Sequence, residues 1–168
     1  SDALLNYVNT ADGAFQYSLA RTNSGAGYTS YVIDLKSQQW RTAADVSKPI
    51  WQHWVQIIVP AGAVADTALI YVHGGSTNAN PPSSTDSTLV SYALQTHSVI
   101  VDLPNVPNQP LFFSDEPTNS QTEDEIIAYS YDQYMRHIGE PGNDTWPVLQ
   151  AMVKSVVRTM DTVQAYVP

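Results

Sequence analysis

Two short apolar segments with a helical pattern between them constrain the fold of this chain more than any other feature. Residues 67–72 (TALIYV) form a continuously apolar run, typical of a strand buried on both faces of a parallel sheet. Residues 98–103 (SVIVDL) repeat that pattern, and apolar residues recur at helical spacing over 84–96. A strand, a crossover helix and a strand within about 35 residues predict a right-handed βαβ unit with parallel strands.

Two further segments are predicted to belong to the same sheet. Residues 28–35 (YTSYVIDL) alternate in polarity and are rich in β-branched and aromatic side chains, which indicates a strand. Residues 51–59 (WQHWVQIIV) indicate another strand, stopped by Pro60. The chain before them is expected to form a short helical start and a turn within residues 1–20, followed by a loop at 23–27.

Two helices are predicted after the βαβ unit. Residues 123–136 have helical periodicity with Thr122 as a candidate cap, and a longer helix is expected over 146–166. The proline-rich segment 104–117 before them is expected to be irregular. The longer helix carries one apolar stripe that needs a partner surface. The stripe consists of Leu149, Met152, Val156, Met160 and Val163.

Composition excludes several classes of protein. The chain has 168 residues, 43% of them hydrophobic, and a formal net charge of −9, with no cluster of Lys or Arg. This balance argues against a disordered chain, nucleic-acid binding and an anionic membrane surface, and no apolar run is long enough to span a membrane. The chain contains no cysteine, which excludes disulfides, thiolate metal sites and cysteine nucleophiles.

Sequence motifs predict neither a nucleotide site nor a metal site. The glycines after His73 lack the continuation of a phosphate-binding loop. The four histidines, His53, His73, His97 and His137, are scattered without metal-ligand spacing. We therefore expect no cofactor and no metal.

The turn His73-Gly74-Gly75 directly follows a predicted buried strand. Glycines at such a position let backbone N–H groups point outward, where they can stabilise an oxyanion during acyl transfer. Many α/β-hydrolases have a turn of this kind for that purpose. The alternative is a strand end that needs glycine only for a tight turn.

A nucleophile to accompany this turn is missing from the sequence. No G-x-S-x-G elbow occurs, and Ser76 lies on the loop where an oxyanion hole would be. The residues therefore predict part of a hydrolase-like sheet without a catalytic triad.

Several short sequence segments, in this order along the chain, resemble those of a known protein family. The chain resembles the PhoPQ-activated pathogenicity-related protein family, which includes secreted autocrine proliferation repressors. The strings cover nearly the whole chain, and VPNQPL together with TED is the most specific part. They are residues 37–41 (SQQWR), 51–54 (WQHW), 73–75 (HGG), 106–111 (VPNQPL), 122–124 (TED), 127–132 (IAYSYD), 146–147 (WP), 152–154 (MVK) and 157–161 (VRTMD).

The resemblance implies an exported, secreted or periplasmic protein with an α/β-hydrolase-like fold, related in architecture to serine peptidases of the dipeptidyl-peptidase type. Family members continue into a serine elbow and later acid and His residues. Residues 1–168 would thus be the N-terminal part of a single domain, the first half of its sheet with flanking helices. We expect proteolytic processing of the precursor, with a C-terminal second chain completing the sheet and the triad.

The same resemblance marks candidate site residues. Backbone N–H groups of Gly74, Gly75 and Ser76 would donate to the oxyanion, in preference to the His73 side chain, because family members often lack that histidine. Asn108 and Gln109 could bind a substrate backbone or hold their loop to the sheet. Glu123 and Asp124 could pair with a substrate amine or an arginine of the missing half, or simply be favoured by the helix dipole.

Two functions of different class follow from these expectations. The first is half of a serine hydrolase that acts on a peptide or ester substrate once the C-terminal chain is present. The second is a non-catalytic secreted signalling or binding protein on the same scaffold.

Overall fold

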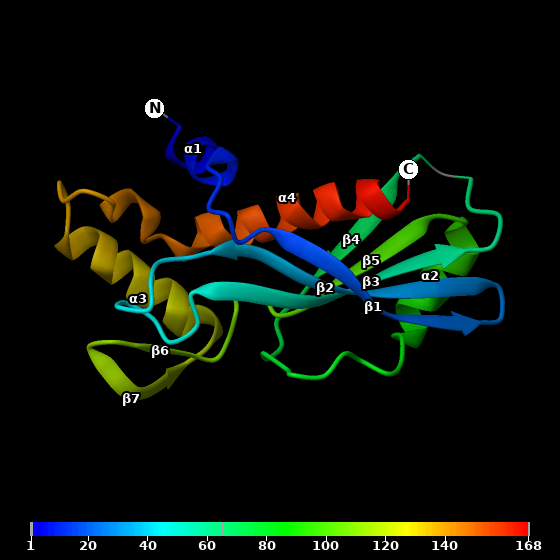
Figure 1. Ribbon diagram of the computed structural model, residues 1–168, viewed down its shortest axis with the longest axis horizontal. Coiled ribbons are helices and arrows are strands. Elements are labelled where there is room, and N and C mark those ends of the chain that lie inside the picture. The colour runs from blue at the N-terminus through cyan, green and yellow to red at the C-terminus, as the bar shows by residue number, and fades with distance from the viewer. Residues whose placement is uncertain (1, 65, 168) are drawn as a thin grey trace.

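A five-stranded sheet with helices on both faces forms the body of the molecule, in a computed structural model that describes residues 2–64 and 66–167 (Figure 1). The strand order is β1-β2-β3-β5-β4, and β6 and β7 form a separate hairpin. The elements are α1 (Ala3–Asn9), β1 (Gln16–Gly25), β2 (Tyr28–Gln39), β3 (Ile50–Pro60), β4 (Ala68–Val72), α2 (Ser87–Thr96), β5 (Val99–Leu103), β6 (Leu111–Phe113), β7 (Glu116–Gln121), α3 (Glu123–Arg136), a 3₁₀ turn (Asn143–Thr145) and α4 (Val148–Tyr166).

The predicted βαβ unit is confirmed. Strands β4 and β5 pair in parallel, with Ala68 opposite Val99, and α2 connects them. The four predicted strands lie in one sheet, but that sheet is mostly antiparallel, because β2 pairs with β1 and β3, and β3 with β5, in antiparallel register. The hairpin connections between β1, β2 and β3 are too short for parallel crossovers.

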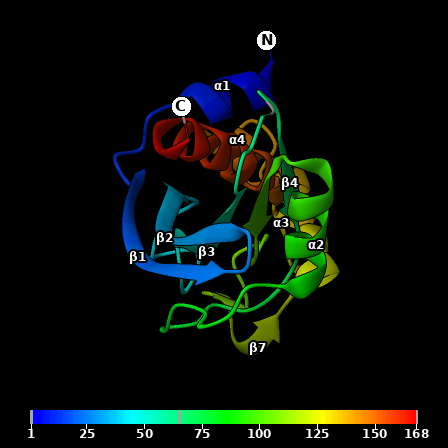
Figure 2. The same ribbon diagram turned by 90° about the vertical axis from the view of Figure 1, so that its right-hand side faces the viewer.

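Strand β3 has buried side chains on both of its faces. Val55 and Ile57 face α4 and pack in one core cluster with Val163. Ile58 packs on the opposite face with Leu89 and Ala93 of α2. Figure 2 shows α4 and α2 on opposite sides of the sheet.

A third cluster is aromatic. It lies where β2 ends and β3 begins, against the β6–β7 hairpin and the start of α4. Trp40 is fully buried and contacts Trp51, Phe113 and Trp146 edge to face. These contacts join the hairpin and the helices to the sheet. Trp51 and Trp146 are also buried, whereas Trp54 is half-buried.

Several element boundaries differ from the sequence prediction. Residues 16–25 form strand β1 instead of a turn and a loop, because their partner is the long strand β2. The segment 104–117 contains β6 and the start of β7. Helix α2 begins only at Ser87, where the Asp86 side chain caps it, and α4 begins at Val148.

The predicted burial of residues 67–72 on both faces is wrong. Leu69, Tyr71 and Val72 are 53%, 50% and 40% exposed. Strand β4 is the last strand of the described sheet and pairs only with β5, so nothing in the described chain covers its outer edge. The apolar run that predicts a central strand is here an edge strand.

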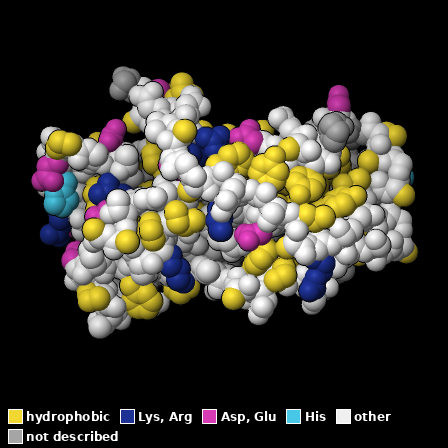
Figure 3. All heavy atoms as spheres, in the orientation of Figure 1, with side chains coloured by type: hydrophobic (Ala, Val, Ile, Leu, Met, Phe, Trp, Pro, Cys, Tyr) yellow, Lys and Arg dark blue, Asp and Glu magenta, His cyan; other side chains and the backbone are white. Residues whose placement is uncertain are grey.

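The apolar stripe of α4 is only partly covered. Met152, Val156 and Val163 pack on the core of the sheet, whereas Leu149 and Met160 are exposed. Figure 3 shows hydrophobic side chains gathered on the surface around the C-terminal half of α4. Apolar surface of this kind is typical of a region that contacts another polypeptide.

Candidate functional site

Three segments meet beyond the C-terminal ends of the parallel strands β4 and β5. They are the glycine turn after β4, the loop after β5 and the first residue of α3. The Asn105 backbone N–H donates to the Gly74 carbonyl at 3.1 Å. The Thr77 N–H donates to the Gln109 carbonyl at 2.8 Å. In open α/β sheets, ligands bind at this edge.

The Gln109 side chain connects all three segments. Its Nε2 donates to the Gly75 carbonyl and to Glu123 Oε1, each at 2.7 Å. Its Oε1 accepts from the Glu123 backbone N–H at 2.8 Å. Because Gln109 is buried, both ends of its amide are committed within the protein. The structure thus brings Gly74, Gly75, Gln109 and Glu123 together from distant parts of the sequence.

Two buried asparagines hold the loop after β5. Asn108 Nδ2 donates to the carbonyls of Lys48 and Ile50 at 3.1 and 3.4 Å. Asn108 Oδ1 accepts from Asn105 Nδ2 at 3.1 Å. Asn105 has a φ of 61°, a left-handed conformation that asparagine tolerates better than most residues. These contacts support the role of Asn108 in holding the loop to the sheet.

The glycine turn presents backbone donors at this edge. In the described part of the chain, the N–H groups of Gly74, Gly75 and Ser76 donate to no protein acceptor. Gly75 has a φ of 145°, which side-chain-bearing residues rarely adopt. A Cβ at Gly74 would collide with the Glu123 carboxylate. The backbone geometry therefore favours glycine at position 75, whereas a side chain at position 74 would have to displace the Glu123 carboxylate.

Glu123 and Asp124 occupy the first turn of α3, which a Thr122–Glu125 capping box begins. Glu123 has a φ of 45° and its exposed carboxylate faces the glycine turn. Asp124 has no hydrogen bond to this cluster within the described residues, and its place in the first turn is favoured by the helix dipole. Of the two acidic candidates, the structure brings only Glu123 to the site.

A histidine–aspartate pair joins the ends of the two strands. His73 Nε2 lies 2.7 Å from Asp102 Oδ1. Burial raises the pKa of Asp102, and the hydrogen bond from His73 opposes that rise. Asp102 is not among the site residues predicted from the sequence, although a carboxylate inside an otherwise apolar strand is a usable signal. Asp102 also lines a cavity of about 420 Å³ together with Ser76, Trp54 and Asn78.

A serine–histidine pair inside the core has a different role. Ser37 Oγ lies 2.9 Å from His53 Nε2, a spacing found between nucleophile and base. The two residues are only 0% and 1% exposed, so no substrate reaches them. His53 Nδ1 lies 3.0 Å from the Pro104 carbonyl, which places the donor proton on Nδ1. The pair therefore links β2 and β3 to the loop after β5.

This buried histidine makes stability depend on pH. Burial lowers the pKa of His53 from 6.5 to about 4. Between these pH values the unfolded chain binds the additional proton, so the stabilisation present above pH 6.5 is lost as pH falls toward 4. We expect a loss of about 3 kcal/mol across this range. Urea unfolding at several pH values measures it.

Two variants separate this effect from general acid sensitivity. His53→Gln should be less stable at neutral pH and should show a shallower pH dependence. His97→Asn replaces an exposed histidine at the left-handed residue after α2 and should keep the full dependence. An unchanged slope in His53→Gln would contradict this assignment.

Comparison with known proteins places the chain in a family. Residues 4–168 match the family model of the PhoPQ-activated pathogenicity-related protein. The chain belongs to this family. It is also 37% identical over 167 residues to autocrine proliferation repressor protein A of Dictyostelium discoideum, covering 99% of this chain and 33% of that protein. The resemblance inferred from the sequence strings is thereby confirmed.

Two solved structures share the fold of this family member. A Bacteroides fragilis protein described as an acetyl xylan esterase matches with a TM-score of 0.51 and 9% identity, over 97% of this chain and 41% of that one. The glucuronoyl esterase of Solibacter usitatus matches with a TM-score of 0.50 and 12% identity, over 98% and 47%. At these identities the likeness shows the fold alone, an esterase-like α/β scaffold.

The chain spans about a third of the length of its curated relative and less than half of either esterase. Within residues 2–64 and 66–167, no helix is long and apolar enough to cross a membrane. The same residues contain no group of three or more His, Asp or Glu side chains placed to hold a metal ion.

Proposed function

We propose that this chain supplies the oxyanion-loop side of a serine-hydrolase site of the peptidase or esterase type. The observation that carries the proposal is the glycine turn of Gly74, Gly75 and Ser76, whose backbone N–H groups have no acceptor in the described chain. The turn lies at the C-terminal edge of a parallel strand pair in an esterase-like scaffold. Donors fixed in advance at such a position stabilise the negative charge that develops during acyl transfer.

The buried amides support this role by fixing the turn. The Gln109 side chain donates to the Gly75 carbonyl and accepts from the Glu123 backbone N–H of α3. The Asn105 backbone N–H donates to the Gly74 carbonyl. A fixed set of donors needs no reorganisation when the oxyanion forms. Asn108 and Gln109 therefore act in this proposal as positioning residues for the loop.

The proposal includes a C-terminal polypeptide of the same precursor, which completes the sheet and brings the nucleophile and the rest of the triad. The exposed outer edge of β4 and the exposed part of the α4 stripe support it. The family relative and both esterases extend well beyond the matched region. Residues 1–168 then form the N-terminal part of one domain, in a protein that we propose to be exported and proteolytically processed.

A serine-directed fluorophosphonate probe tests the proposed activity on the full-length protein. We expect stoichiometric labelling of one serine outside residues 1–168, located by mass spectrometry of the labelled peptide. Ser76→Ala should label normally, because Ser76 contributes a backbone N–H and no nucleophile. A folded full-length protein that the probe leaves unlabelled would refute the hydrolase proposal.

One observation favours the alternative of a non-catalytic secreted signalling protein. The Glu123 carboxylate lies against the glycine turn, and an anion near the oxyanion donors opposes the charge that they would stabilise. The relative named autocrine proliferation repressor protein A fits such a role. If this alternative holds, probe labelling is absent while the protein retains its effect on cell proliferation. A substrate amine pairing with Glu123 would instead reconcile its charge with catalysis.

A further inference from the structure

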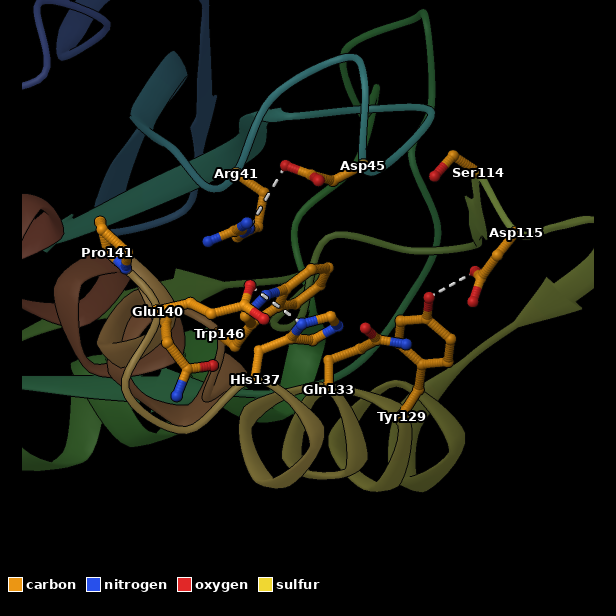
Figure 4. Close-up of a pocket in the computed structure, with 11 residues that line it drawn as sticks. Arg41, Asp45, Ser114, Asp115, Tyr129, Gln133, His137, Glu140, Pro141 and Trp146 are labelled. Atoms are coloured by element: carbon orange, nitrogen blue, oxygen red, sulfur yellow. Dashed lines mark hydrogen bonds and ion pairs between the residues drawn. The ribbon is translucent and has the colours of Figure 1, made fainter.

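A second cavity lies away from the glycine turn, at the far end of α3. It has a volume of about 310 Å³, within the size range of small-ligand sites. Figure 4 shows it enclosed by the residues that follow β2, the turn between β6 and β7, the C-terminal half of α3 and the segment leading to α4. The titratable residues of its lining are Arg41, Asp45, Asp115, Tyr129, His137 and Glu140.

The Arg41 guanidinium is the positive charge in this lining, and its Nε makes no hydrogen bond within the described residues. The Arg41 guanidinium carbon lies 4.0 Å from the centroid of the Trp146 ring. Its Nε lies 3.3 Å from Asp45 Oδ2, and one terminal nitrogen donates to Thr145 Oγ1 at 2.7 Å. A terminal nitrogen of Arg41 also donates to the Gly142 carbonyl at 3.1 Å. Arg41 and Asp45 therefore neutralise each other.

The other two carboxylates of the cavity, Asp115 and Glu140, lie outside this ion pair. Asp115 accepts from the Tyr129 hydroxyl, and burial together with this carboxylate raises the pKa of Tyr129. Glu140 Oε2 lies 3.1 Å from His137 Nδ1. The lining holds three carboxylates against one guanidinium and one imidazole. The cavity therefore has an excess of negative charge, in a chain of net charge −9.

The cavity lining also contains a buried, neutral hydrogen-bond acceptor. Asn143 is 8% exposed and lines the cavity, and its Nδ2 donates to the Tyr134 carbonyl. Its Oδ1 has no partner within the described residues. A buried amide oxygen without a donor is costly, and a ligand N–H group that reached it would satisfy it.

The two carboxylates stand at opposite ends of one helical row. Tyr129, Gln133 and His137 follow one another at spacing four on α3, so they share a face and span about 12 Å. Figure 4 shows Asp115 beside Tyr129 at one end and Glu140 beside His137 at the other, with Gln133 between them and the Trp146 ring behind. The site thus offers two separated anionic ends joined by an amide and an aromatic wall.

We propose that this cavity binds a linear polyamine, a flexible chain with an ammonium group near each end. One ammonium pairs with Asp115 and the other with Glu140. The connecting methylenes lie along the Trp146 ring, and Gln133 and Asn143 accept from amine N–H groups. A compact divalent cation does not fit, because the carboxylates stand at opposite ends of the row and no described group of three ligands converges.

Isothermal titration of the full-length protein with spermidine, octylamine and 1,8-octanediol tests the proposal. We expect saturable spermidine binding that weakens with added salt, about tenfold weaker binding of the monoamine and none of the diol. Absence of saturable spermidine binding at millimolar concentration would overturn the proposal. Equal binding of the diol would also overturn it.

Matched variants locate the binding site. Asp115→Asn and Glu140→Gln should each weaken spermidine binding about threefold to fivefold, the usual effect of one partly exposed ion pair. Asp132→Asn removes a carboxylate from the same helix outside the cavity lining, where it pairs with Arg136, and should leave binding unchanged. If Asp132→Asn weakens spermidine binding as much as Glu140→Gln does, the binding reflects general charge attraction. That result would refute a specific site in this cavity. None of these outcomes depends on hydrolase activity.

Discussion

Replacing Gly75 by valine in the full-length protein is expected to lower kcat about 100- to 1000-fold, the usual effect of removing one oxyanion donor. Gly75 has a φ of 145°, and it lies between Gly74 and Ser76, whose N–H groups have no acceptor among the described residues, so the turn is sensitive to any rotation. A valine forces this backbone toward an ordinary φ, which swings the N–H away from the edge of the sheet. Kinetics on a p-nitrophenyl ester and urea unfolding measure the two effects separately.

The backbone strain itself should cost only about 1–3 kcal/mol of stability. Gly62→Val is the matched control, because Gly62 has a φ of 71° in open surroundings outside the site. It should lose comparable stability and keep its kcat. If Gly75→Val loses activity only in proportion to unfolding, the glycines serve the turn alone. Gly74→Ala adds a further comparison, since its methyl group must displace the Glu123 carboxylate while the fold is kept.

Residues 1–168 expressed alone are expected to self-associate. Strand β4 exposes its outer edge with Leu69 and Tyr71, and Leu149 and Met160 of α4 are exposed as well. An uncovered apolar edge strand is a template for pairing with a second chain. Sedimentation of the fragment, alone and after coexpression with the C-terminal polypeptide, measures the effect. Coexpression should give one soluble complex with an interface of roughly 2,000 Å² or more, as obligate interfaces have.

A lysine substitution on the edge strand β4 tests whether this edge causes the self-association of the fragment. Leu69→Lys should strongly reduce self-association of the fragment, because a charge on an edge strand opposes strand pairing. Leu19→Lys places the same charge on β1, the other edge of the sheet, and should have little effect. A fragment that is soluble, monomeric and cooperatively folded without any substitution would contradict the need for a second polypeptide.

Much of the candidate site was predictable from local sequence. The glycine turn follows a strand whose apolar composition is evident, and the strings VPNQPL and TED point to the segments that carry Gln109 and Glu123. Their meeting was not predictable, because it depends on the hydrogen bonds of Gln109 to Gly75 and Glu123 across sequence separations of 34 and 14 residues. The pair of His73 and Asp102 was missed for the same reason, since the register of β4 against β5 decides it.

Local sequence was enough to predict the βαβ unit, strand β3 and the helices over 123–136 and 146–166. In each of these the pattern of apolar side chains matches the period of one element, so the local chain contains the information. Tertiary structure alone decided that residues 16–25 form a strand, because their hydrogen bonds come from β2. It also decided that the apolar strand β4 lies at an exposed edge. Apolar composition shows that a strand is suited to burial, whereas its burial depends on which neighbours the rest of the chain places beside it.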